Sequence, residues 1–286
     1  MIFYFMYRIG IFLALSLPLK WAYRVAILFS DLHYLFAGKD RANVAANLRV
    51  IFPEKRLSEI RAIRLAMTRN FAKYLVDFFR FPLLEKETVK NFIDFENLNY
   101  LDGALAKGKG GIILSAHISN WELAGAGVGL LGYPLLAVAL PHRHKAVDDF
   151  FNRQRQEKGM SVIPLGRAAR QCFRLLRENK LIALVGDRVF NSNGILIDFF
   201  GLPTRIPAGP AAFSLKADSP IIPAFMRRNA DDRFTLVFEK PVEFEPSGDK
   251  DKDIRDLTYK CSKIIEQYIR RYPEQWFMFR KFWVKE

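Results

Sequence analysis

From about residue 96 onward, short apolar runs alternate with segments that have the spacing of helices. The apolar runs predict strands near 111–115, 134–140, 161–164, 181–185, 195–199, 221–226 and 234–239. The intervening segments predict helices near 120–131, 145–158, 167–178, 208–217 and 251–271. Strands that alternate with helices form a mainly parallel sheet with helices on both faces. The sequence therefore predicts an α/β fold for residues 96–286.

The N-terminal part has a different pattern. Residues 9–19 form an uncharged run of eleven residues between Arg8 and Lys20, and aromatic side chains surround it. A transmembrane helix needs about 20 apolar residues, so this run is short for one. We expect residues 1–40 to be an uncleaved membrane anchor that lies in the bilayer or crosses it shallowly as a transmembrane helix; a buried helix of a soluble protein is the alternative. Residues 41–95 have helical spacing and form a second segment.

Composition restricts the partners. Lys and Arg number 44 against 30 Asp and Glu, which gives a net charge of +14 and a pI near 9.8. This excess predicts acidic partners: nucleic acid, anionic lipid headgroups, phosphorylated substrates or an acidic carrier protein. Cys172 and Cys261 give neither a disulfide framework nor a zinc site. His142 and His144 lack a carboxylate or cysteine at ligand spacing, so we expect no metal site.

The segment 115–122 carries the residues best suited to acid–base chemistry. It follows an apolar strand, and the carboxyl ends of strands are where open α/β sheets place their active sites. His117 and Glu122 would meet if His117 lies in the loop and Glu122 lies in the first helical turn. Ser119 would then be the N-cap, with Ser119 and Glu122 as a capping box. In this arrangement Glu122 orients the imidazole and His117 takes a proton from a substrate hydroxyl.

Each of these residues also has a simpler interpretation. Glu122 would only cap the helix, and His117 would be a polar loop residue. Asp187 follows the predicted strand 181–185, and we weigh a catalytic role and a turn-forming role for it equally. No serine or cysteine lies in a nucleophile elbow, so the sequence does not predict a covalent intermediate on either residue type.

A basic stretch follows the candidate site. Residues 141–180 contain ten Lys or Arg and four acidic residues, for a net charge of +6. A solvated helix face is the usual role of such a run. We place Arg153 and Arg155 in the active site and assign the later arginines, including Arg167 and Arg170, to an acidic carrier or to headgroups.

Five segments, which follow one another along the chain, resemble segments of the late acyltransferases of lipid A biosynthesis. His117-Ile-Ser-Asn-Trp-Glu122 is similar to the catalytic motif of that family, and Gly186-Asp187-Arg188 to its downstream acidic turn. The other three are the segments 47–53 (NLRVIFP), 143–155 with Arg143-His144 and Asn152-Arg153-Gln154-Arg155, and 273–283 (PEQWFMFRKFW). The resemblance covers nearly the whole chain.

The resemblance implies transfer of a fatty acyl group from acyl carrier protein to a hydroxyl of a lipid A precursor. It also implies a bacterial inner-membrane anchor with the catalytic domain on the cytoplasmic side and a glycerolipid acyltransferase-like fold. No cofactor is expected besides the acyl donor. The expected catalytic residues are His117, Glu122, Arg153, Arg155 and Asp187. Those expected to bind substrate are Asn120, Arg143, Arg188, Arg167 and Arg170.

Three alternatives remain at this stage. A lysophospholipid acyltransferase shares a histidine–acid motif, but usually with Asp and with a downstream Glu-Gly-Thr-Arg, and neither is present. A non-enzymatic basic membrane-binding protein would make the spacing of His117 and Glu122 a coincidence. Nucleic-acid binding rests only on the pI, because no recognisable nucleic-acid-binding motif accompanies it.

Overall fold

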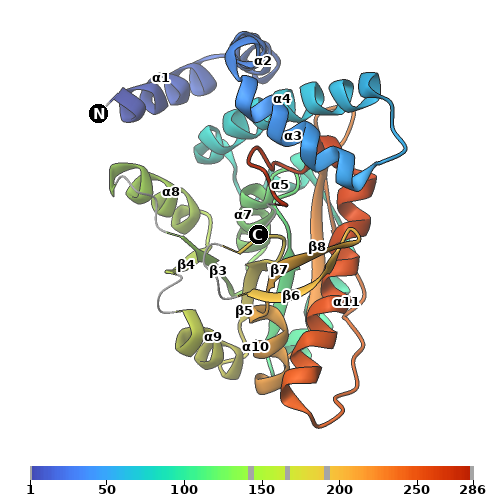
Figure 1. The fold of residues 1–286 in the computed structure, drawn as a ribbon. Helices are drawn as coiled ribbons and strands as arrows, with labels where there is room; N and C mark the ends of the chain where they lie inside the picture. Colours follow the sequence, from blue (N-terminus) through green and yellow to red (C-terminus); the bar gives the residue numbers. More distant parts are fainter. Residues whose placement is uncertain (1, 141–144, 165–167, 190–193, 284–286) are drawn as a thin grey trace.

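A seven-stranded sheet forms the centre of the protein (Figure 1). The computed structural model describes residues 2–140, 145–164, 168–189 and 194–283. Five of the six strand pairs are parallel, and only β8 and β9 run antiparallel. The prediction of a mainly parallel sheet flanked by helices is confirmed. In spatial order the strands are β1 (Ile93–Glu96), β9 (Phe234–Phe238), β8 (Ile221–Arg228), β2 (Gly111–Ser115), β5 (Leu181–Val185), β3 (Leu135–Ala139) and β4 (Ser161–Pro164).

The central strand β2 shows why its sequence is a continuous apolar run. Successive side chains of a strand point to opposite faces, and a parallel strand covered by helices is buried on both. Ile112 and Leu114 pack into one core, whereas Ile113 packs into the core on the other face. All three are buried, so the apolar run fixes the position of β2 inside the molecule.

Helices cover both faces of the sheet. One core receives side chains from α6 (Asn99–Ala106), α7 (Trp121–Leu130) and α8 (Lys145–Glu157). The opposite core receives side chains from α9 (Ala168–Arg177), α10 (Gly209–Ala217) and α11 (Lys250–Arg271). Three short helical pieces are also present, namely α5 (Val89–Phe92), η1 (Phe81–Leu83) and η3 (Pro273–Gln275).

The observed elements differ from the predicted ones in two ways. The run 195–199 lies outside the central sheet, because β6 (Gly194–Phe199) pairs only with β7 (Leu202–Pro207) in a separate antiparallel hairpin. The turn between them has positive φ at Phe200 and Gly201, which reverses the chain over two residues. Strands β1 and β7 and helix α6, which are short elements, were not predicted from the sequence.

The N-terminal part of the chain contains the helices α1 (Ile2–Ser16), α2 (Leu19–Phe36), α3 (Gly38–Ile51) and α4 (Leu57–Phe79). Helix α3 ends directly before Phe52-Pro53, as the disfavoured helical conformation of a residue before proline requires. The first three helices all contact α4, so the long α4 joins them to the α/β part. Figure 1 shows α1 and α2 at the top of the molecule.

The first two helices expose large apolar side chains. Phe12, Trp21, Phe29 and Phe36 are each more than half exposed. No helix among the described residues is both long enough and apolar enough to cross a bilayer. The transmembrane helix expected from the sequence is therefore not found in that part of the chain.

Candidate active site

His117 lies in the loop after β2 and pairs with a carboxylate from the neighbouring strand. Its Nδ1 lies 2.6 Å from Oδ1 of Asp187. Asp187 follows β5, and β2 and β5 are parallel neighbours whose last residues, Ser115 and Val185, are in register. The two strands therefore place both side chains at one edge of the sheet, where such folds carry their ligands.

Gly186 allows this close approach. Its N–H donates to the carbonyl oxygen of Ser115 at 2.8 Å, which joins the two strand ends. A Cβ atom at this position would lie 2.7 Å from Leu114 Cδ1 and 3.2 Å from Ile265 Cδ1. A larger residue would push the turn away from Leu114, and Asp187 would move with it.

Asp187 is held as a carboxylate inside the protein. Its side chain is fully buried, and Oδ2 accepts a hydrogen bond from Trp276 Nε1 at 3.0 Å and an ion-pair contact from Arg188 at 3.3 Å. Burial opposes ionisation, but His117, Arg188 and Trp276 together outweigh it and hold the pKa of Asp187 well below its usual range. An ionised Asp187 stabilises the protonated imidazole and fixes which nitrogen of His117 carries the resident proton.

The C-terminal segment fixes the loop that carries His117. The backbone N–H of Ser119 donates to Gln275 at 2.7 Å, and that of Phe277 donates to the carbonyl oxygen of His117 at 3.0 Å. Between them, Trp276 is completely buried and reaches Asp187. In the sequence, this segment was interpreted only as a family signature. The role of Trp276 was missed.

The predicted pairing of His117 with Glu122 is wrong. Both carboxylate oxygens of Glu122 bind Arg155 instead, with Oε2 at 2.8 Å from Nε and Oε1 at 2.5 Å from Nη2. Both side chains are less than a tenth exposed. Glu122 lies in the first turn of α7 and Arg155 in the last turn of α8, so this ion pair joins two helices.

The helix cap was also assigned to the wrong residue. Asn120 is the N-cap of α7, because its Oδ1 accepts from the N–H of Leu123 at 2.9 Å. Ser119 has a positive φ of 52° and its buried hydroxyl has no hydrogen-bond partner among the described residues. The chain therefore turns one residue later than predicted, and the carboxylate of Glu122 lies on the side of α8.

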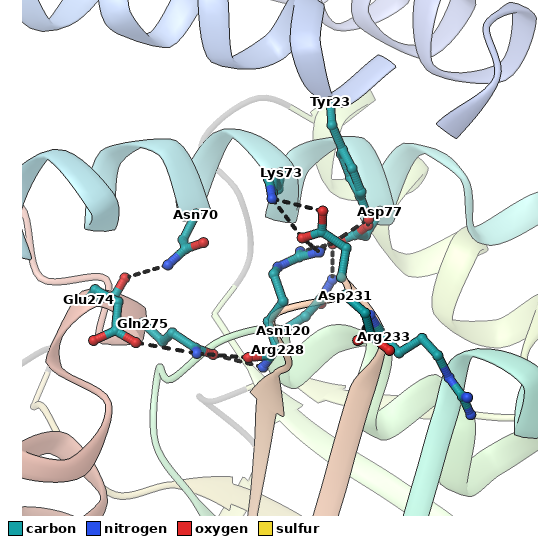
Figure 2. A network of polar contacts seen from close by, with 11 residues as sticks. Tyr23, Asn70, Lys73, Asp77, Asn120, Arg228, Asp231, Arg233, Glu274 and Gln275 are labelled. Atoms are coloured by element: carbon teal, nitrogen blue, oxygen red, sulfur yellow. Dashed lines mark hydrogen bonds and ion pairs between the residues drawn. The ribbon is translucent and has the colours of Figure 1, made fainter. Parts of the chain in front are cut away.

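Asn120 belongs to a second buried polar cluster (Figure 2). Its Nδ2 donates to Asp77 on α4 at 3.4 Å, and Asp77 also binds Arg228 on β8 and the hydroxyl of Tyr23 on α2. The neighbouring carboxylate raises the pKa of Arg228, despite its burial, so this guanidinium stays charged. The cluster ties α2, α4 and β8 to the loop between His117 and Glu122.

The other predicted site residues are dispersed. Arg153 on α8 and Arg170 on α9 are exposed. Arg188 is largely buried beside Asp187, and its Nη2 donates to the carbonyl oxygen of Phe277 at 3.2 Å. Arg143 and Arg167 lie outside the described residues. Of the four predicted arginines that the structure describes, Arg155 and Arg188 lie at the candidate site.

An apolar cavity of about 270 Å³, here called the catalytic cavity, begins beside His117. The ring of Trp121 lies edge-on to the imidazole, with the centroids 4.8 Å apart. The Glu122–Arg155 pair is the charged part of its wall. Most of the remaining wall is aliphatic or aromatic, including Tyr74, Val128, Leu135, Phe151, Met160, Leu184 and Leu236. The shape and lining suit a hydrocarbon chain whose reactive end meets His117.

The chain is similar to known acyltransferases. The model of the family described as bacterial lipid A biosynthesis acyltransferase matches residues 1–285. A phosphatidylinositol mannoside acyltransferase of Mycolicibacterium smegmatis is 27% identical over 225 residues, which cover 77% of this chain and 72% of that protein. The lipid A biosynthesis acyltransferase of Haemophilus influenzae is 23% identical over 84% of this chain and 74% of its own length. The lipid A biosynthesis palmitoleoyltransferase of Escherichia coli is 24% identical over 83% and 77%.

Proposed function

The chain belongs to the bacterial lipid A biosynthesis acyltransferase family, and we propose that it moves a fatty acyl chain from a thioester donor to a hydroxyl of an anionic glycolipid. That it is an acyltransferase follows from the family and from the relatives. The observation that carries the finer proposal is the His117–Asp187 pair beside an apolar cavity. A base next to a hydrocarbon site is what transfer of an acyl chain requires.

His117 acts as the general base in the proposed reaction. Because Nδ1 binds Asp187, Nε2 takes the proton of the acceptor hydroxyl. The acceptor oxygen attacks the thioester carbonyl carbon and forms a tetrahedral intermediate. Its collapse breaks the C–S bond, and the thiolate leaves with the proton that His117 returns. The products are an ester and a free thiol, so the transfer balances without a cofactor.

The catalytic cavity holds the donor chain in this proposal. Gly125 on α7 and Met160 lie against each other in its wall, since a Cβ on Gly125 would be 2.5 Å from Met160 Sδ. The transferred chain therefore extends from His117 along α7 toward Met160. Burial of each additional methylene contributes about 0.8 kcal/mol, which gives the cavity a preference among chain lengths.

The proposed donor is acyl carrier protein and the proposed acceptor a lipid A precursor. The net charge of +14 supports both, because an acidic carrier and a phosphorylated lipid are each drawn to a basic surface. Exposed Arg170 and Arg174 on α9 are candidates for the carrier contact. We place the protein at the bacterial inner membrane with its α/β part toward the cytoplasm. The exposed apolar side chains of α1 and α2 support the membrane contact.

Single-turnover transfer with purified protein tests the proposal. We expect His117→Ala to slow acyl transfer from acyl carrier protein to a lipid A precursor by about 10²–10⁴-fold, while the donor still binds. A phosphatidylinositol mannoside and a lysophospholipid serve as competing acceptors. Transfer by His117→Ala at the wild-type rate would sink the assignment of the base. Preferential use of the lysophospholipid would instead contradict the acceptor class.

A further inference from the structure

The N-terminal helices enclose a second apolar cavity of about 760 Å³, here called the N-terminal cavity. Leu13 of α1, Ala26 of α2 and Ala72 and Val76 of α4 line it. Its volume lies within the range of small-molecule and lipid sites. The small alanine side chains on facing helices leave the space that larger side chains would fill.

Helix α4 separates the N-terminal cavity from the catalytic cavity. Leu75, Val76 and Phe79 face the N-terminal cavity, whereas Tyr74 lines the catalytic cavity. The two cavities share no lining residue among the described part of the chain. A chain in the N-terminal cavity is therefore separate from the acyl group that His117 would act on.

The charged residues that line the N-terminal cavity are Arg41, Arg64 and Asp40, so its described lining carries a net positive charge. The guanidinium of Arg64 donates to the hydroxyl of Tyr34 at 2.7 Å and to the carbonyl oxygen of Arg41 at 3.0 Å. The guanidinium of Arg41 lies over the ring of Tyr34, 5.3 Å from its centroid. In the described ranges no carboxylate is within ion-pair distance of either arginine. Two guanidinium groups that hold no carboxylate provide a site for a phosphate.

Part of the lining belongs to the exposed apolar surface of α2. Phe29, Leu32 and Phe36 line the cavity and are each more than half exposed. Exposure of these apolar side chains to water is unfavourable, and the interface of a bilayer would cover them. A lipid could then enter the N-terminal cavity from the bilayer without passing through water.

We propose that the N-terminal cavity binds one acyl chain of an anionic bilayer phospholipid, with its phosphate at Arg41 and Arg64. The chain lies between α2 and α4, and the headgroup stays beside the two arginines. Occupation by a membrane lipid would fix α2 against α4. Tyr23 of α2 also binds Asp77, so the same lipid supports the polar cluster that holds the His117 loop (Figure 2).

Photolabelling of the full-length protein tests the proposal without depending on turnover. The probe is phosphatidylglycerol with a diazirine near the end of one chain, in vesicles of phosphatidylcholine. We expect crosslinks at Ala72 and Val76, which line the cavity, in addition to the exposed face of α2. Labels confined to exposed residues outside the cavity, such as Phe12 and Leu28, would overturn the proposal. Failure here leaves the proposed acyl transfer intact, because the assay measures binding alone.

Two variants with matched controls sharpen the test. Ala72→Phe fills the cavity and should abolish labelling at Val76, whereas Ala42→Phe on the exposed face of α3 should not. Arg41→Gln should lower that labelling about tenfold, the loss expected for one charge-assisted contact, while Lys39→Gln leaves it unchanged. Labelling that survives Ala72→Phe, or that ignores Arg41→Gln, contradicts the proposal. Protection by a lipid A precursor but not by unlabelled phosphatidylglycerol would contradict it as well, because the occupant would then be the acceptor.

Discussion

Asp187 and Glu122 are two buried carboxylates near the same loop, and they differ in the cation that each one binds. Asp187 binds the imidazole of His117, a group that can accept a proton and return it during a reaction. Glu122 binds a guanidinium through two hydrogen bonds, and that group stays protonated at any physiological pH. A carboxylate beside a group that accepts a proton can stabilise the positive charge that forms on that group. A carboxylate beside a permanent cation fixes the position of a helix.

The comparison predicts its largest effect on turnover. Asp187→Asn should lower kcat by as much as about 10⁴-fold, because an amide neither stabilises the imidazolium nor selects its tautomer. Glu122→Gln should lower kcat far less, since its partner Arg155 takes no part in the proton transfer. Rates of acyl transfer under saturating donor measure both, with Asp251→Asn at the exposed start of α11 as the matched control. A larger loss for Glu122→Gln than for Asp187→Asn would reverse the assignment of roles.

The Glu122–Arg155 pair should matter for folding stability more than for turnover. Breaking a buried ion pair by removing one partner costs about 3–5 kcal/mol, because an uncompensated charge remains inside. Glu122→Ala and Arg155→Ala should therefore each lower the free energy of unfolding by about this amount. Combining Glu122→Leu with Arg155→Met should recover most of it, because both charges are then absent. Urea denaturation checks the three variants, and single substitutions that cost less than about 1 kcal/mol would show that the pair is not structural.

The fold was predictable from the sequence further than the site was. The strands around β2 and β5 were predicted because each is a continuous apolar run, and their parallel pairing brings Asp187 to His117. The predicted pairing of His117 with Glu122 was wrong because closeness along the chain does not decide in which direction a side chain points. Asn120 rather than Ser119 begins α7, which puts Glu122 on the side of α8.

Contacts made across long stretches of chain account for the rest. Arg155 lies 33 residues from Glu122, and Trp276 lies 89 residues from Asp187. Local spacing contains no information on either contact, because helix packing and the path of the C-terminal segment decide both. The short strand β1 was missed for the same reason. It is held at the edge of the sheet by its pairing with β9, which is 141 residues away.

Acid should reveal the charge on Asp187. Its folded-state pKa is depressed below the value of about 3.9 expected for an unfolded aspartate, so the stabilisation is present above that pH. It is lost progressively as the pH falls below about 4 toward the folded-state value. We expect the free energy of unfolding of the wild type to fall between about pH 5 and pH 2 more steeply than that of Asp187→Asn. Urea titrations across this range measure both slopes, and equal slopes would mean that Asp187 is not held ionised.

Trp276 should give the smallest effect, and it separates support of Asp187 from packing. Trp276→Phe removes only the N–H that donates to Asp187 Oδ2 and keeps most of the buried ring. His117 and Arg188 remain in contact with the carboxylate, so we expect kcat to fall about tenfold or less, which corresponds to about 1.4 kcal/mol. Trp283→Phe is the matched control, because Trp283 lies in the same C-terminal segment as Trp276. Its indole donates to Thr204 on β7 and does not touch Asp187. An equal loss of kcat in both variants would assign the effect to packing of the C-terminal segment. A loss confined to Trp276→Phe would show that a residue 89 positions away in the chain helps to hold the charge that His117 requires.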